Sequence, residues 1–69
     1  MKNNIKMYRA TLGLTQEALA DTIGVTRQTV IAIESDKYLP SLGLAFKIAR
    51  LFHVSVEEVF MYADKEESV

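Results

Sequence analysis

The sequence predicts an all-α fold of five short helices. Apolar residues recur at spacings of three and four along most of the chain, which is the period of one helix face. Residues that cap helix N-termini stand directly before such segments at Thr15, Thr26 and Ser55. Ser55 and Glu58 also have the spacing of a capping box, so the last helix has the clearest start.

The first, fourth and fifth helices are expected over residues 4–12, 41–52 and 56–61. Pro40 keeps the preceding loop out of the helical region. Residues 60–62 have an alternative, which is to extend as a short strand. The residues expected to face inward on these helices are Ile5, Tyr8, Leu12, Leu42, Ala45, Ile48, Ala49, Phe52, Val56, Val59 and Phe60.

The second and third helices are expected over residues 16–23 and 27–34, with three residues between them. Gly24 suits the left-handed residue that closes a helix. Ala20 is small enough to let two helices approach across so short a turn. This pattern predicts a helix-turn-helix.

Arg27 and Gln28 open the third helix on the face opposite its apolar residues. The Arg guanidinium can donate two hydrogen bonds to guanine, and the Gln amide can donate one to adenine and accept one from it in the major groove. The N-terminal residues of a recognition helix contact bases. Two polar residues on a solvated helix face would be unremarkable alone. Their place after a tight turn favours the interpretation that this is a recognition helix.

The net charge of −1 hides an uneven distribution. Residues 1–56 carry seven Lys or Arg against four acids, a balance of +3, whereas residues 57–69 carry one Lys against five acids, a balance of −4. The local field decides phosphate binding, so a basic body remains compatible with nucleic acid. Residues 64–69 lack an apolar period and are expected to form a flexible acidic tail.

A chain of 69 residues predicts one domain, with its core over residues 5–60. Cysteine is absent, His53 lacks companions for a metal site, and no apolar run reaches the ~20 residues that span a bilayer. The sequence also shows no nucleophile with its base and no glycine-rich phosphate loop. We therefore expect a cytoplasmic, non-enzymatic protein without cofactor, metal or small-molecule ligand.

A set of residues with a characteristic joint spacing runs along the chain: Arg9, Leu14-Thr15-Gln16, Ala20, Gly24-Val25-Thr26, Ile33-Glu34, Pro40-Ser41 and Ile48-Ala49. In these residues the chain resembles, over residues 5–60, the XRE-type helix-turn-helix family, which includes the phage Cro and repressor proteins. The segments that resemble small stand-alone bacterial and archaeal regulators are Arg27-Gln28-Thr29, Lys37-Tyr38, Pro40-Ser41-Leu42, Leu44-Ala45, Lys47-Ile48-Ala49 and Glu57-Glu58-Val59-Phe60. The specific signal is their joint spacing. The resemblance implies a compact five-helix, lambda-repressor-like domain.

The resemblance also implies a transcriptional regulator that binds a palindromic operator in double-stranded DNA as a homodimer, with its third helix in the major groove. Gln16 matches a backbone-phosphate contact, and Lys37 matches another in the following loop. The DNA-binding residues so implied are Thr15, Gln16, Thr26, Arg27, Gln28, Thr29, Ile31, Ala32 and Lys37. Relatives often place a polar, base-contacting residue at the position of Ala32. Recognition of bases by this chain is therefore expected either to be narrower or to rely on contact between Ala32 and a thymine methyl group. Ile31 is either a thymine-methyl contact or part of a partner surface.

Arg9 and Glu34 match a pair that forms an internal salt bridge in this family, so both are expected to be structural. Apolar residues beyond the needs of one core predict a two-fold dimer contact made by Phe46, Leu51, Val59, Met61 and Tyr62; the alternative is further monomer core. A repressor is expected, because no separate activation or ligand-binding domain is visible. The rival hypothesis is an antitoxin-like protein-interaction module on the same fold, using Ile31 and the acidic tail.

Overall fold

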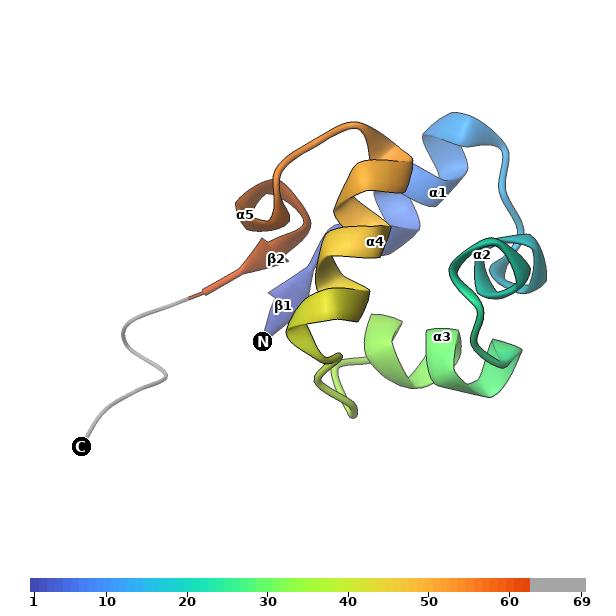
Figure 1. Cartoon of the computed structure of the whole chain (residues 1–69), viewed down its shortest axis with the longest axis horizontal. Coiled ribbons are helices and arrows are strands. Elements are labelled where there is room, and N and C mark those ends of the chain that lie inside the picture. Colours follow the sequence, from blue (N-terminus) through green and yellow to red (C-terminus); the bar gives the residue numbers. More distant parts are fainter. Residues whose placement is uncertain (63–69) are drawn as a thin grey trace.

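The computed structural model describes residues 1–62, so the expected tail over residues 64–69 lies outside the described residues. The elements within this range are β1 (Lys2–Asn3), α1 (Ile5–Leu12), α2 (Gln16–Ile23), α3 (Arg27–Glu34), α4 (Leu42–Phe52), α5 (Val56–Val59) and β2 (Phe60–Met61). In Figure 1, α4 crosses the middle of the molecule, with α2 and α3 on one side and α5 and the strands on the other. The predicted five-helix fold is confirmed.

The helices begin where the sequence signals place them. Thr15 and Thr26 each accept a hydrogen bond from the backbone N–H three residues on, at 3.0 and 3.2 Å. Ser55 and Glu58 form the predicted capping box. Gly24 closes α2 in the left-handed region, at φ 77°. These local contacts satisfy the unpaired amides and carbonyls of the helix ends, which is why the short helices end so sharply.

The core lies among all five helices. Its buried residues are Ile5, Leu19, Ala20, Ile23, Val30, Ile33, Ala45, Ile48, Ala49, Phe52, Val59 and Phe60. The prediction that Leu12 and Leu42 face inward was wrong, because their side chains are 51% and 70% exposed. Each lies in the terminal turn of its helix, where the apolar period continues beyond the elements that could cover it.

The chain ends of the fold meet in a two-stranded antiparallel sheet, which pairs Lys2 with Met61 and Asn3 with Phe60. The prediction that α5 ends near Met61 was wrong, since the helix stops at Val59 and the alternative of a short strand holds. β1 was not predicted at all. Backbone pairing of β1 with β2 explains the early end of α5.

No helix among residues 1–62 is long and apolar enough to cross a membrane.

Candidate nucleic-acid interface

The turn between α2 and α3 is tight. Gly24 is left-handed, and the Val25 N–H donates to the carbonyl of Ala20 at 3.0 Å. Ala20 is fully buried, which places the end of α2 directly against its neighbours. The direction of α3 relative to α2 is therefore set by a short hydrogen-bonded turn, as a helix-turn-helix requires.

The N-terminal end of α3 presents exposed polar side chains. Arg27 and Gln28 are exposed, whereas Val30 and Ile33 anchor the opposite face in the core. Thr29 is half-buried, and its hydroxyl lies 3.1 Å from the Thr26 hydroxyl. Arg27 and Gln28 are consequently the two long polar side chains available for contacts at this end of the helix.

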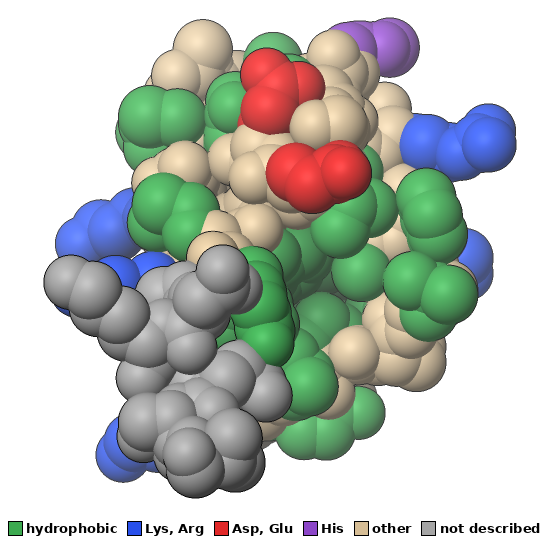
Figure 2. Space-filling model, turned by 90° about the vertical axis from the view of Figure 1, so that its left-hand side faces the viewer, with side chains coloured by type: hydrophobic (Ala, Val, Ile, Leu, Met, Phe, Trp, Pro, Cys, Tyr) green, Lys and Arg blue, Asp and Glu red, His purple; other side chains and the backbone are tan. Residues whose placement is uncertain are grey.

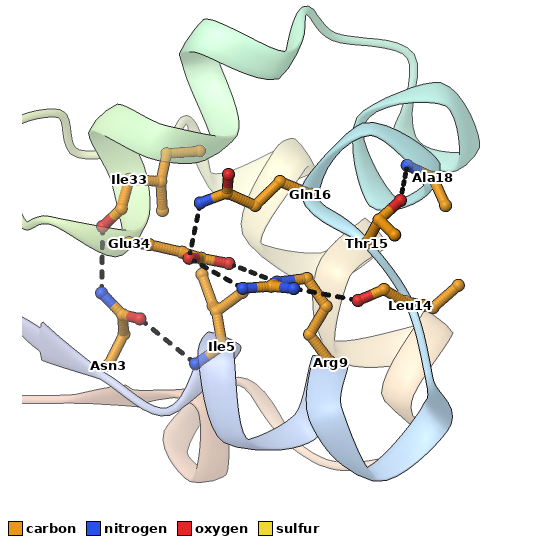
Figure 3. Close-up of polar contacts among 9 residues, drawn as sticks. All are labelled: Asn3, Ile5, Arg9, Leu14, Thr15, Gln16, Ala18, Ile33 and Glu34. Atoms are coloured by element: carbon orange, nitrogen blue, oxygen red, sulfur yellow. Dashed lines mark hydrogen bonds and ion pairs between the residues drawn. The ribbon is translucent and has the colours of Figure 1, made fainter.

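The C-terminal end of α3 is held by a polar cluster, drawn in Figure 3, that consists of Arg9, Gln16 and Glu34. Arg9 Nε lies 2.7 Å from Glu34 Oε2, and both side chains are largely buried at 15% and 10% exposure. Gln16 Nε2 donates to Glu34 Oε1 at 3.2 Å. Arg9 Nη1 donates to the Leu14 carbonyl at 2.9 Å, so the cluster joins α1, α2 and α3.

Asn3 adds a contact to this end of α3 that sequence reasoning missed. Its Nδ2 donates to the Ile33 carbonyl at 3.0 Å, and its Oδ1 accepts from the Ile5 N–H at 3.2 Å. Figure 3 shows this side chain bridging the end of β1 and α3. The role depends on β1, for which a two-residue segment gives no periodic signal.

Two hollows share Gln16 in their lining. The first, of about 380 Å³, is lined by Arg9, Thr15, Gln16, Glu17 and Arg27. The second, of about 400 Å³, is lined by Asn3, Lys6, Gln16, Ile31, Glu34 and Ser35. The structure thus brings Thr15, Gln16 and Arg27 together. Ile31 lines the second hollow instead, beside Asn3, Lys6 and Ser35, which sequence reasoning did not select.

Two further predicted contacts lie beyond these hollows. Lys37 is exposed in the loop after α3, and its backbone N–H donates to the Ala32 carbonyl at 2.9 Å. The Ser35 hydroxyl donates to the same carbonyl at 3.2 Å. Ala32 itself is half-buried.

The residues described hold no group of three or more His, Asp or Glu placed to bind a metal ion.

The predicted dimer residues differ in their exposure. Phe46, Met61 and Tyr62 are exposed. Val59 is 0% exposed, so placing it in a dimer contact was wrong: this last residue of α5 belongs to the hydrophobic core of the monomer and has no surface left for a partner. Leu51 is half-buried and packs against the core.

A helix-turn-helix family model matches residues 5–59. The chain belongs to this family, the XRE-type helix-turn-helix proteins. An uncharacterized HTH-type transcriptional regulator of Methanocaldococcus jannaschii is 61% identical over 66 residues, which cover 96% of this chain and 100% of the relative. The uncharacterized HTH-type transcriptional regulator YgzD of Bacillus subtilis is 55% identical over 60 residues, covering 87% and 91% of the two chains.

Solved structures of helix-turn-helix proteins share the fold. The restriction-modification controller protein C.AhdI of Aeromonas hydrophila has a TM-score of 0.74 and 30% identity, with 83% of each chain covered. A hypothetical transcription factor from Neisseria has a TM-score of 0.76 and 25% identity, covering 93% of this chain and 74% of its own. Relatives and structures therefore agree with the sequence resemblance to transcriptional regulators.

Proposed function

We propose that this protein is a sequence-specific transcriptional repressor that binds a palindromic operator as a homodimer, with α3 in the major groove. One observation carries the proposal: Arg27 and Gln28 are exposed at the N-terminal end of a helix whose other end is fixed. Bound across a promoter, such a domain excludes polymerase by occupancy alone. The relatives come from bacteria and archaea, where DNA lies in the cytoplasm, and we place its action there.

Each predicted contact has a role in this proposal. Arg27 and Gln28 hydrogen-bond base edges, while Thr26 and Thr29 contact the DNA beside them. Ile31 and Ala32 offer apolar contacts to thymine methyl groups farther along α3. The remaining contacts fix the register of the protein on the phosphate backbone and are made by Thr15, Gln16 and Lys37.

An apolar face supports the second half of the proposal, the homodimer. Figure 2 shows hydrophobic side chains gathered around a hollow on one side of the molecule. This hollow, of about 260 Å³, is lined by Met1, Leu39, Pro40, Leu42, Ala45, Val56 and Phe60. Exposed Phe46 and Met61 add to the apolar surface of the same α4–β2 region. A two-fold contact here would cover a patch that monomeric proteins rarely leave open, and would present two recognition helices.

Leu42→Glu should weaken this dimer, because a carboxylate in the contact cannot keep its water shell. Leu42 is 70% exposed, so the monomer should fold unchanged. Sedimentation equilibrium should give a dimer Kd at least ~10-fold weaker than wild type. Leu12→Glu is the matched control, since Leu12 is 51% exposed on α1 and does not line the hollow. Equal effects of the two changes, or a wild type monomeric at high micromolar concentration, would refute the contact.

The DNA-binding proposal is tested by selecting sequences from a random duplex library. The wild type is compared with an Arg27→Ala/Gln28→Ala variant, and circular dichroism confirms that both fold. We expect a two-fold symmetric motif from the wild type alone, with half-sites about one helical turn (~34 Å) apart. A folded wild type that enriches no motif would refute sequence-specific binding and direct attention to protein partners.

A further inference from the structure

Lys6 is a cation that lines the same hollow as Gln16, the predicted phosphate contact. No pattern in the sequence indicated a role for Lys6. It is exposed on α1, three residues before Arg9, so the two side chains leave the same side of the helix. Arg9 forms an ion pair with Glu34, with 2.7 Å between Arg9 Nε and Glu34 Oε2. Lys6 instead lines the hollow beside Gln16, and neither ion pair within residues 1–62 includes it.

The charge balance of this hollow leaves Lys6 uncompensated. Its one lining carboxylate is Glu34, which is 10% exposed and neutralised by Arg9. Gln16 donates a further hydrogen bond to the same carboxylate. The other lining residues are uncharged, so the hollow carries a net positive charge and attracts anions.

The position of Gln16 links this hollow to DNA. Gln16 lines both hollows, with Arg27 in the first and Lys6 in the second. Because the two hollows share Gln16, a DNA strand whose phosphate meets Gln16 lies next to Arg27 in one hollow and next to Lys6 in the other. Glu17 opposes phosphate only in the first hollow, which makes the second the more favourable of the two.

We propose that Lys6 binds a backbone phosphate next to the one at Gln16, which extends the DNA interface from α2 and α3 onto α1. This inference rests on the proposed DNA-binding function. The chemistry involved is a point-charge contact between an ammonium group and a phosphate. It therefore adds affinity without sequence preference.

The test measures DNA affinity against salt concentration for the wild type, Lys6→Gln and Lys6→Arg. The control is Arg50→Gln, which removes the same charge from the last turn of α4, at the end away from α3 in Figure 1. Each lost phosphate contact lowers the slope of log affinity against log salt by ~0.9, so the wild-type advantage over Lys6→Gln should shrink about threefold per protomer between 50 and 200 mM salt. Selected operator and unrelated duplex should show the same loss.

The expected result is a lower slope for Lys6→Gln, with Lys6→Arg and Arg50→Gln close to the wild type. Equal losses for Lys6→Gln and Arg50→Gln would overturn the inference, because total charge would then explain both. A loss confined to the selected operator would overturn the phosphate assignment in favour of base contact. A wild type that binds no DNA would refute the proposed function itself, which is a different outcome from wild-type binding with an unchanged Lys6→Gln slope.

Discussion

The two ends of α3 are built differently. At the C-terminal end, Glu34 receives hydrogen bonds from α1 and α2, and Asn3 donates to the Ile33 carbonyl from β1. At the N-terminal end, the side-chain hydrogen bonds among the described residues are local ones between Thr26 and Thr29, and apolar packing of Val25 and Val30 holds the helix to the core. Polar contacts from distant parts of the chain fix one end, whereas the other end has only local polar contacts.

Because of this difference, the contacts that fix the direction of α3 and the side chains proposed to contact bases lie at opposite ends of the helix. A recognition helix needs a fixed direction, and contacts far from the bases can provide it without occupying the reading side chains. Arg27 and Gln28 remain exposed because the polar side-chain contacts between α3 and other elements lie at its far end, and its apolar residues pack on the opposite face. We therefore expect substitutions at the fixed end to change stability strongly, and those at the open end to change it little.

The largest expected effect is that of Glu34→Ala. Removing this carboxylate leaves the largely buried Arg9 guanidinium unpaired, which should lower the free energy of unfolding by about 3–5 kcal/mol. Urea unfolding followed by circular dichroism at 25 °C measures it. Glu17→Ala is the matched control, because Glu17 is exposed and should stay within ~0.5 kcal/mol of wild type. An unchanged unfolding midpoint for Glu34→Ala would show that the Arg9–Glu34 pair does not stabilise the fold.

A smaller effect is expected for Thr26→Ala at the open end. The Thr26 hydroxyl caps one amide of α3, so its loss should cost about 1 kcal/mol. Thr26→Ser keeps the hydroxyl and should restore most of the stability. The same urea experiment serves, and a loss as large as that of Glu34→Ala would contradict the contrast between the two ends.

Local signals made the fold predictable. The caps Thr15, Thr26 and Ser55 each act on an amide three residues away, and Gly24 acts through its own backbone, so the sequence carries these features directly. The exposure of Leu12 and Leu42 was not predictable in this way. It depends on which other elements reach the helix ends, and helical periodicity contains no such information.

The candidate site divides along the same line. Arg27 and Gln28 were predicted from their position in the helix, whereas the Arg9–Glu34 pair followed only from the family resemblance, because 25 residues separate the partners. Asn3 and Lys6 were missed. The contact of Asn3 with α3 depends on the pairing of β1 with β2. The proposal for Lys6 depends on its lining the same hollow as Gln16, which the sequence does not show.

The most direct test of the account is a thermodynamic cycle between Arg27 and one base pair of the selected operator. Operator affinity is measured for the wild type and Arg27→Ala, on the operator and on a duplex with the contacted guanine replaced. We predict that the base change costs the wild type ~1–3 kcal/mol and costs Arg27→Ala almost nothing, with both proteins unfolding at the same urea concentration. Equal costs of every base change in the two proteins would show that Arg27 does not read the operator.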